Sequence, residues 1–126
     1  MKIVKLTDIE EMKGKGFALW QLINPNTVGS KNAMLFVVTL EPGGKIPVHT
    51  HGPADVTIYV LEGRGAFLVN EERQILEPET ALYVPIGAGI GIDNVGEKTL
   101  RFIAAIAPPI DVETCPVCGI KVTPKN

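Results

Sequence analysis

The sequence predicts an all-β domain of the sandwich or small-barrel type, and three observations support this fold class. Eight or more short apolar segments recur along the chain, at a spacing of roughly 8–12 residues that is typical of such folds. Turn-forming residues separate them, with 13 glycines and 10 prolines in the chain. The length of 126 residues suits one domain, and it is too short for a dinucleotide-binding fold or a large α/β barrel.

Each apolar segment is an expected strand because it is rich in β-branched and aromatic residues and stops at a turn signal. Residues 8–13 are polar and are expected to form a turn or a short helix. Residues 24–32 contain proline and glycine and are expected to form a loop. The expected strands cover residues 3–6, 17–23, 33–40, 47–51, 55–61, 66–69, 74–76, 81–84, 90–93 and 99–107.

The chain divides into a β-barrel domain at residues 1–110 and a tail at residues 111–126. The division follows two consecutive prolines, Pro108 and Pro109, after which the strand-like alternation of apolar residues stops. The tail holds both cysteines of the chain. Two cysteines only three positions apart cannot staple a fold, so a reducing compartment is expected.

Composition excludes several classes of partner. Twelve basic residues stand against 14 acidic ones, so the basic surface that a nucleic-acid-binding protein needs is not expected. The longest apolar run, residues 33–38, is far shorter than the ~20 residues that span a bilayer. The first residues build no continuous apolar segment like that of a signal peptide. We therefore expect a cytoplasmic protein with no membrane or nucleic-acid partner.

The only histidines, His49 and His51, are the first candidates for chemistry. Residues i and i+2 of a strand share one face, so two imidazoles at this spacing could converge on one metal ion. They could equally face solvent or pack inside the domain with their hydrogen bonds satisfied.

The residues around this pair resemble the two sequence motifs of the cupin superfamily. In the first motif a glycine precedes His-x-His, and a second glycine follows it. The second motif contains Pro-x-Gly followed by an asparagine. The matching positions are Gly43, His49, His51, Gly63, Pro85, Gly87 and Asn94. The resemblance implies a double-stranded β-helix, or jelly-roll, barrel and a divalent metal held by three histidines and a glutamate.

This chain departs from the cupin motifs at two of the four metal ligands. Val56 occupies the glutamate position and Ile90 the position of the third histidine. Asp55 is adjacent to the first of these, but an offset of one residue turns a strand side chain to the opposite face. The remaining pair, His49 and His51, would be a partial metal site.

The departures favour a small-molecule-binding barrel in which His49 and His51 serve as hydrogen-bonding or acid/base groups. The alternative is a divergent metal-dependent enzyme, because similar cupins include isomerases, dioxygenases and lyases. The ligand cavity is expected to be lined by Val56, Ile58, Val60 and Ile90.

The tail carries a second feature, the segment Cys-Pro-Val-Cys-Gly at residues 115–119. It resembles the knuckle with which rubredoxins and zinc ribbons bind a metal, so Cys115 and Cys118 are expected zinc ligands. A closed zinc site needs two more ligands, and these could come from a second subunit's knuckle or from His49 and His51. The knuckle could then join subunits or partners, as in an interaction module. Otherwise the cysteines are ordinary thiols or a disulfide.

The protein is expected to be a homodimer. The apolar segments 17–23 and 33–40 exceed what one small core needs, and small cupins commonly pair through an outer sheet face. Two-fold pairing is also the commonest assembly of soluble proteins.

Overall fold

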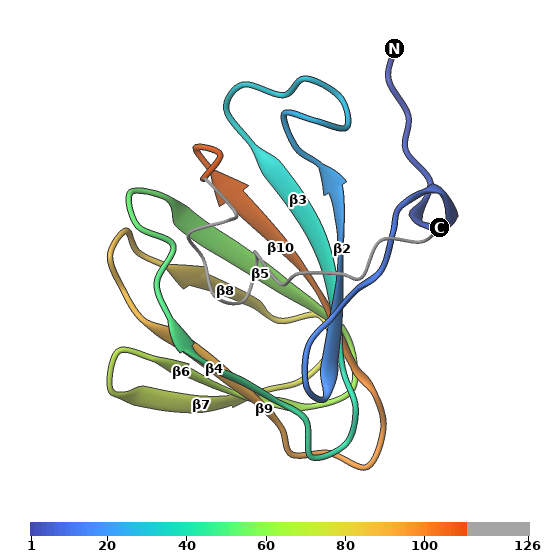
Figure 1. Cartoon of the computed structure of the whole chain (residues 1–126). Helices are drawn as coiled ribbons and strands as arrows, with labels where there is room; N and C mark the ends of the chain where they lie inside the picture. The colour runs from blue at the N-terminus through green and yellow to red at the C-terminus, as the bar shows by residue number, and fades with distance from the viewer. Residues whose placement is uncertain (111–126) are drawn as a thin grey trace.

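The computed structural model describes residues 1–110 and confirms the all-β fold, with two antiparallel sheets that face each other (Figure 1). The larger sheet has six strands in the order β1-β2-β3-β10-β5-β8, and the smaller has four in the order β4-β9-β6-β7. This arrangement is consistent with a jelly-roll barrel. The bounds are β1 Met12–Lys13, β2 Phe17–Ile23, β3 Met34–Leu40, β4 Lys45–His49, β5 Asp55–Glu62, β6 Gly65–Val69, β7 Glu72–Leu76, β8 Ala81–Val84, β9 Ile90–Asn94 and β10 Leu100–Ala107.

The amino-terminal segment differs from the prediction. Residues 3–6 were expected to form a strand, but the chain there is irregular and enters a 3₁₀ helix at Leu6–Asp8. Ile3 is 74% exposed, so a strand at this position would gain little from apolar burial. The expected turn or short helix at residues 8–13 contains part of this 3₁₀ helix and also β1, which pairs with Ala18 and Leu19 of β2.

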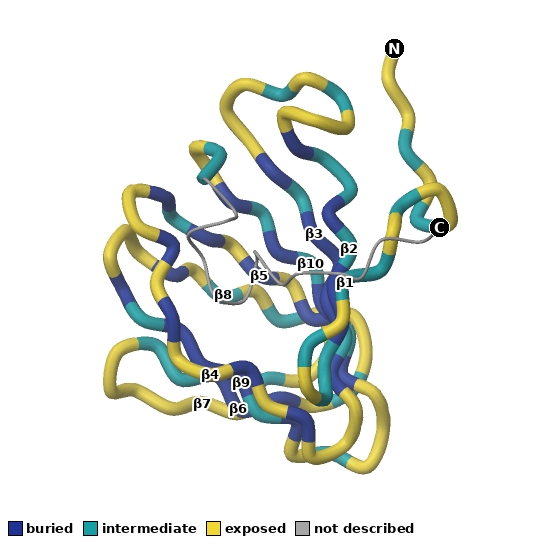
Figure 2. Tube along the Cα trace, viewed as in Figure 1, coloured by how far each residue is buried: buried dark blue, intermediate teal, exposed yellow. Residues whose placement is uncertain are grey.

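The core lies between the two sheets and follows the period of two along each strand. On β5 the core side chains alternate with exposed positions (Figure 2), whereas β3 has three consecutive buried residues, Phe36 to Val38. Phe67 of β6 and Phe102 of β10 meet across the core in an edge-to-face contact, with ring centroids 5.7 Å apart. This contact connects the middle of one sheet to the middle of the other.

A bulge in β4 determines where the first histidine lies. Ile46 pairs with Ile92 of β9 and His49 pairs with Ile90, so two residues of β4 stand opposite one residue of β9. One of the two is Pro47, which has no N–H to give to the ladder. The other is Val48, whose methyl group lies so close to Gly91 that a β-carbon there would be 2.9 Å from it. The bulge thereby turns both Ile46 and His49 into the interior, although they are three residues apart.

Asn94 is the last residue of β9, at the end of the strand away from Ile90, the partner of His49. Its side chain hydrogen-bonds three backbone groups at this end of the barrel. Its side-chain amide donates to the carbonyl oxygens of Leu40 (2.9 Å) and Lys98 (2.8 Å), and its Oδ1 accepts from the backbone N–H of Gly96 at 3.0 Å. The side chain is 4% exposed. It therefore satisfies three backbone groups, one in a buried contact at Leu40 and two in partly buried contacts at Lys98 and Gly96.

Replacing Asn94→Ala is expected to lower the free energy of unfolding by about 2–3 kcal/mol, because it leaves buried backbone groups without partners. Urea unfolding followed by circular dichroism measures the change. Asn32→Ala, at an exposed loop position, is the control and should change stability by less than ~0.5 kcal/mol. Equal stability of the two variants would contradict this role for Asn94.

Candidate functional site

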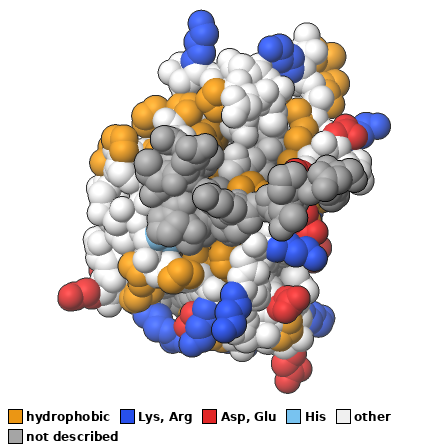
Figure 3. All heavy atoms as spheres, viewed as in Figure 1, with side chains coloured by type: hydrophobic (Ala, Val, Ile, Leu, Met, Phe, Trp, Pro, Cys, Tyr) orange, Lys and Arg blue, Asp and Glu red, His pale blue; other side chains and the backbone are white. Residues whose placement is uncertain are grey.

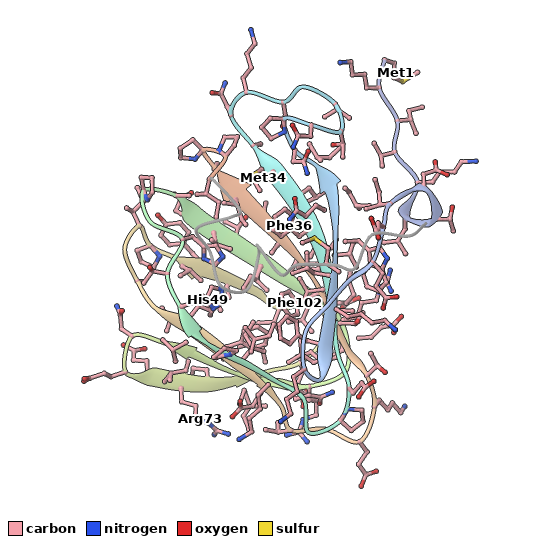
Figure 4. All side chains as sticks on the ribbon, in the orientation of Figure 1. Met1, Met34, Phe36, His49, Arg73 and Phe102 are labelled. Atoms are coloured by element: carbon pink, nitrogen blue, oxygen red, sulfur yellow. The ribbon has the colours of Figure 1, made fainter. Side chains whose placement is uncertain are left out.

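A pocket between the sheets brings both histidines together with apolar side chains from both sheets. Its volume is about 40 Å³. Figure 4 shows His49, Phe36 and Phe102 around the space between the sheets. The pocket is lined by Leu19, Phe36, Val38, Ile46, His49, His51, Val56, Ile58, Ile90, Ile92, Phe102, Ala104 and Ile106.

The geometry of His49 fixes which ring nitrogen carries the proton. Its Nδ1 lies 2.8 Å from the carbonyl oxygen of Pro47. A carbonyl oxygen can only accept a hydrogen bond, so Nδ1 must donate. In the neutral ring the lone pair is then on Nε2, which is available to accept a hydrogen bond or coordinate a metal.

His51 lies beside His49 but not on the same strand, which differs from the reasoning that placed both on one strand face. β4 ends at His49, because the chain turns through Gly52 and Pro53 and the N–H of Ala54 bonds back to the carbonyl oxygen of His51 at 3.1 Å. The two rings are still close, with centroids 4.7 Å apart and planes at 67°. The turn follows His51, so one ring is on the last residue of β4 and the other is two residues further along the chain.

Both histidines are nearly buried, with 8% of His49 and 9% of His51 exposed. A small area of histidine surface is visible from outside in Figure 3, between hydrophobic side chains. Burial lowers the pKa of His51 from 6.5 to about 4, and the neighbouring His49 contributes in the same direction. Removing a cation from water and placing it near a second ring that can be protonated both disfavour the charged form. His51 is therefore neutral at pH 7.

The structure brings three of the four predicted cavity residues to the histidines. Val56, Ile58 and Ile90 line the pocket, and Ile90 is the direct cross-strand partner of His49. Val60 is fully buried in the same core cluster but is not a lining residue. Asp55 accepts a hydrogen bond from the Tyr83 hydroxyl at 3.0 Å in an exposed position, while its neighbour Val56 is buried.

The described residues do not form a metal site on their own. No three or more His, Cys, Asp or Glu side chains within residues 1–110 are grouped so that they could hold a metal ion. Two imidazoles are fewer than the three protein ligands of even an open zinc site, and Val56 and Ile90 have no donor atoms. Cys115 and Cys118 lie outside the described residues.

Sequence reasoning missed the pocket residues that β2, β3 and β10 of the larger sheet supply. Leu19, Phe36 and Phe102 come from β2, β3 and β10, and their period-two positions on these strands were the available signal. It also missed Gln21, which follows Leu19 on the inner face and is only 9% exposed. The amide oxygen of Gln21 accepts from the side chain of Asn24 at 2.9 Å. A single polar residue within the apolar run of β2 was the signal for it.

Comparison with known proteins identifies the family. The family model described as "Cupin domain" matches residues 36–106, which is more than half of the chain, so this protein belongs to the cupin domain family. No helix in residues 1–110 is long and apolar enough to cross a membrane.

The similar proteins include several with polyketide names. The chain is 28% identical over 107 residues to polyketide synthase CurC from Streptomyces cyaneus, covering 85% of this chain and 70% of that protein. It is 29% identical over 105 residues to the tetracenomycin polyketide synthase protein TcmJ from Streptomyces glaucescens, covering 83% and 70%. The solved structure of the polyketide cyclase RemF from Streptomyces resistomycificus is similar with a TM-score of 0.71 and 25% identity, covering 85% of this chain and 79% of that one.

The lowered pKa of His51 predicts a specific pH dependence of stability. The unfolded chain takes up a proton on His51 near pH 6.5, whereas the folded chain does so only near pH 4. The contribution of His51 to stability is therefore complete above about pH 6.5 and is lost as the pH falls toward 4. Urea midpoints at about pH 7.5 and pH 5 should differ less in His51→Gln than in the unchanged protein. An identical pH dependence in both proteins would show that His51 titrates normally.

Proposed function

We propose that the barrel binds a small, largely apolar organic molecule in the pocket between its sheets, and that His49 and His51 make the polar contacts. The observation that carries the proposal is the pair of buried imidazoles in a pocket that is otherwise apolar. Ligand sites commonly combine an apolar lining with a few convergent polar groups. The polyketide names of CurC, TcmJ and RemF support an organic ligand rich in carbon.

The chemistry of the pair fits binding and proton transfer. The Nε2 lone pair of His49 is oriented by the Nδ1 bond to Pro47, so it can accept a hydrogen bond from a ligand hydroxyl. The same atom can take up a proton from that hydroxyl, since a neutral imidazole is a general base near neutral pH. His51, whose ring centroid is 4.7 Å away, adds a second imidazole to the contact surface, and this one is neutral at pH 7.

A larger side chain inside the pocket should weaken the binding of small organic molecules. Val56→Phe adds a ring inside the pocket, and the matched variant Thr57→Phe adds the same ring at the next residue of β5, on the exposed face. A screen of neutral aromatic fragments by saturation-transfer NMR should give hits that the unchanged protein and Thr57→Phe bind equally. Val56→Phe should bind them at least about tenfold more weakly, a difference of ~1.4 kcal/mol. Hits that bind Val56→Phe equally well would place the site elsewhere, and circular dichroism checks that both variants fold.

We also propose, as a second function, zinc binding that uses the tail cysteines. The observation that favours it is the proximity of the two imidazoles, one of which has an oriented Nε2 lone pair. Two histidines and two thiolates are a common closed ligand set for zinc, and Cys115 and Cys118 supply the thiolates in the sequence.

Zinc content tests this arrangement. Protein purified under reducing conditions with zinc is expected to hold one zinc per chain if the histidines complete the site, and one per two chains if two knuckles combine. Zinc should disappear in the double variant Cys115→Ser, Cys118→Ser in either case, since thiolates are needed for a closed site. In His49→Ala, zinc should be lost only if the histidines complete the site. Metal-free protein under these conditions would leave two ordinary thiols and contradict the proposal.

The third proposal is a homodimer formed through the outer face of the six-stranded sheet. A row of apolar side chains crosses four strands on this face, since Trp20 pairs with Val37, Val37 with Ile103, and Ile103 with Tyr59. None of the four belongs to the core cluster between the sheets. Tyr59 is 42% exposed and Trp20 and Ile103 are partly exposed, whereas Val37 is buried, so part of this apolar row is accessible in the single chain.

The dimer predicts a mass of twice the 13.5 kDa chain in light scattering at micromolar concentration. Ile103→Lys places a charge in the middle of the apolar row and should shift the protein to monomer, because an unpaired charge is costly to bury in an interface. The control is Ile75→Lys on β7 of the other sheet, at a position that is 43% exposed. A monomeric mass for the unchanged protein would overturn the proposal.

A further inference from the structure

The pocket carries no formally charged side chain to balance a charged ligand. Eleven of its 13 lining residues are apolar and the other two are His49 and His51, with no Asp, Glu, Lys or Arg among the lining residues that the structure describes. Moving a carboxylate into such surroundings without a partner costs several kcal/mol. The lining therefore favours an uncharged ligand over an anion.

The oriented nitrogen of His49 adds a second selection, by hydrogen-bond direction. Its Nδ1–H is used by the carbonyl oxygen of Pro47 at 2.8 Å, so the neutral ring presents Nε2 as an acceptor. An ionised carboxylate can only accept hydrogen bonds. A carboxylate oxygen next to Nε2 would place two hydrogen-bond acceptors in contact with no proton between them. A hydroxyl group would instead donate a hydrogen bond to Nε2.

The size of the pocket limits what can enter it. A volume of about 40 Å³ holds roughly three water molecules, at ~10–15 Å³ for each. The buried part of the ligand is therefore a hydroxyl and the carbons next to it, while the rest of the molecule stays nearer the opening. Displacing a few waters from an apolar pocket is favourable when the entering group replaces their hydrogen bond to the protein.

From these three observations we propose that the pocket selects an uncharged hydroxyl group on an apolar carbon frame, of the phenol or enol type, and rejects the matching carboxylate. The hydroxyl donates its hydrogen bond to Nε2 of His49, and the adjoining carbons contact Val56 and Ile90, which replace the two cupin metal ligands. This selectivity rests on the proposed small-molecule function of the same pocket, and it specifies the chemical class of the ligand that the pocket binds.

Three probes with the same ring test the selection: phenol, benzoate and toluene. Each is titrated at about pH 7.5 into protein with labelled isoleucine methyl groups, so that Ile58, Ile90 and Ile92 report entry into the pocket. Phenol is expected to bind at least tenfold more tightly than benzoate and more tightly than toluene. The Nε2 nitrogen signal of His49 should shift with phenol and not with toluene, because only phenol donates a hydrogen bond.

Three variants separate the hydroxyl contact from the pocket itself. His49→Phe removes the acceptor and should make phenol and toluene bind equally, while Val56→Phe should weaken both and Thr57→Phe neither. Should His49→Phe fail to fold, the nitrogen shift of the unchanged protein still decides the question. Benzoate binding as tightly as phenol, or toluene binding as tightly as phenol, would overturn the selection and leave the small-molecule function standing. If none of the three probes shifts a pocket methyl group, and the fragment screen also gives no pocket ligand, both proposals fail.

Discussion

The structure depends on the contact between the inner faces of its two sheets, and the edge-to-face pair of Phe67 and Phe102 lies at the middle of that contact. Phe67 is on β6, which pairs with two strands of the smaller sheet, and Phe102 is on β10, which pairs with β3 and β5. Buried aromatic pairs of this geometry contribute roughly 0.5–1.5 kcal/mol beyond their apolar area. The two rings connect the inner faces of the sheets. The pocket lies beside them, since Phe102 also lines it.

Much of this fold follows from local sequence patterns. The segments 17–23 and 81–84 match β2 and β8 residue for residue, because period-two alternation and flanking turn residues both act over short distances. Gly63 combines a local requirement, its backbone conformation, with a long-range one, the close approach of another strand's backbone. Its φ of +81° and the 2.5 Å that would separate a β-carbon from the carbonyl oxygen of Thr99 require glycine at the turn after β5. The failure at residues 3–6 has a non-local cause, since a strand needs an edge to pair with and apolar residues alone do not supply one.

The site was less predictable than the fold because its geometry depends on interruptions of regular structure. Alternation along one strand suggests that His49 and His51 converge, and their rings are adjacent, although β4 itself ends at His49. A bulge at Pro47 and Val48 turns His49 inward, and the chain leaves the strand before His51 and turns at Gly52 and Pro53. Neither the bulge nor the turn changes the spacing of two residues, so spacing alone could not distinguish a continuous strand from this arrangement.

Val56 and Ile90 together have a physical effect on the pocket that neither residue has alone. One carboxylate at the position of Val56, without a metal, would be a buried charge beside two imidazoles and would favour their protonated forms. With valine there and isoleucine at position 90, the pocket has neither the carboxylate nor the third imidazole that the cupin motifs imply at these positions. Burial then keeps His51 neutral, which its lowered pKa reflects, while the bond to Pro47 keeps the acceptor of His49 directed away from that carbonyl. Relative to the four ligands that the cupin motifs imply, Val56 and Ile90 leave an apolar pocket with an oriented proton acceptor, which is the combination on which the proposed neutral ligand rests.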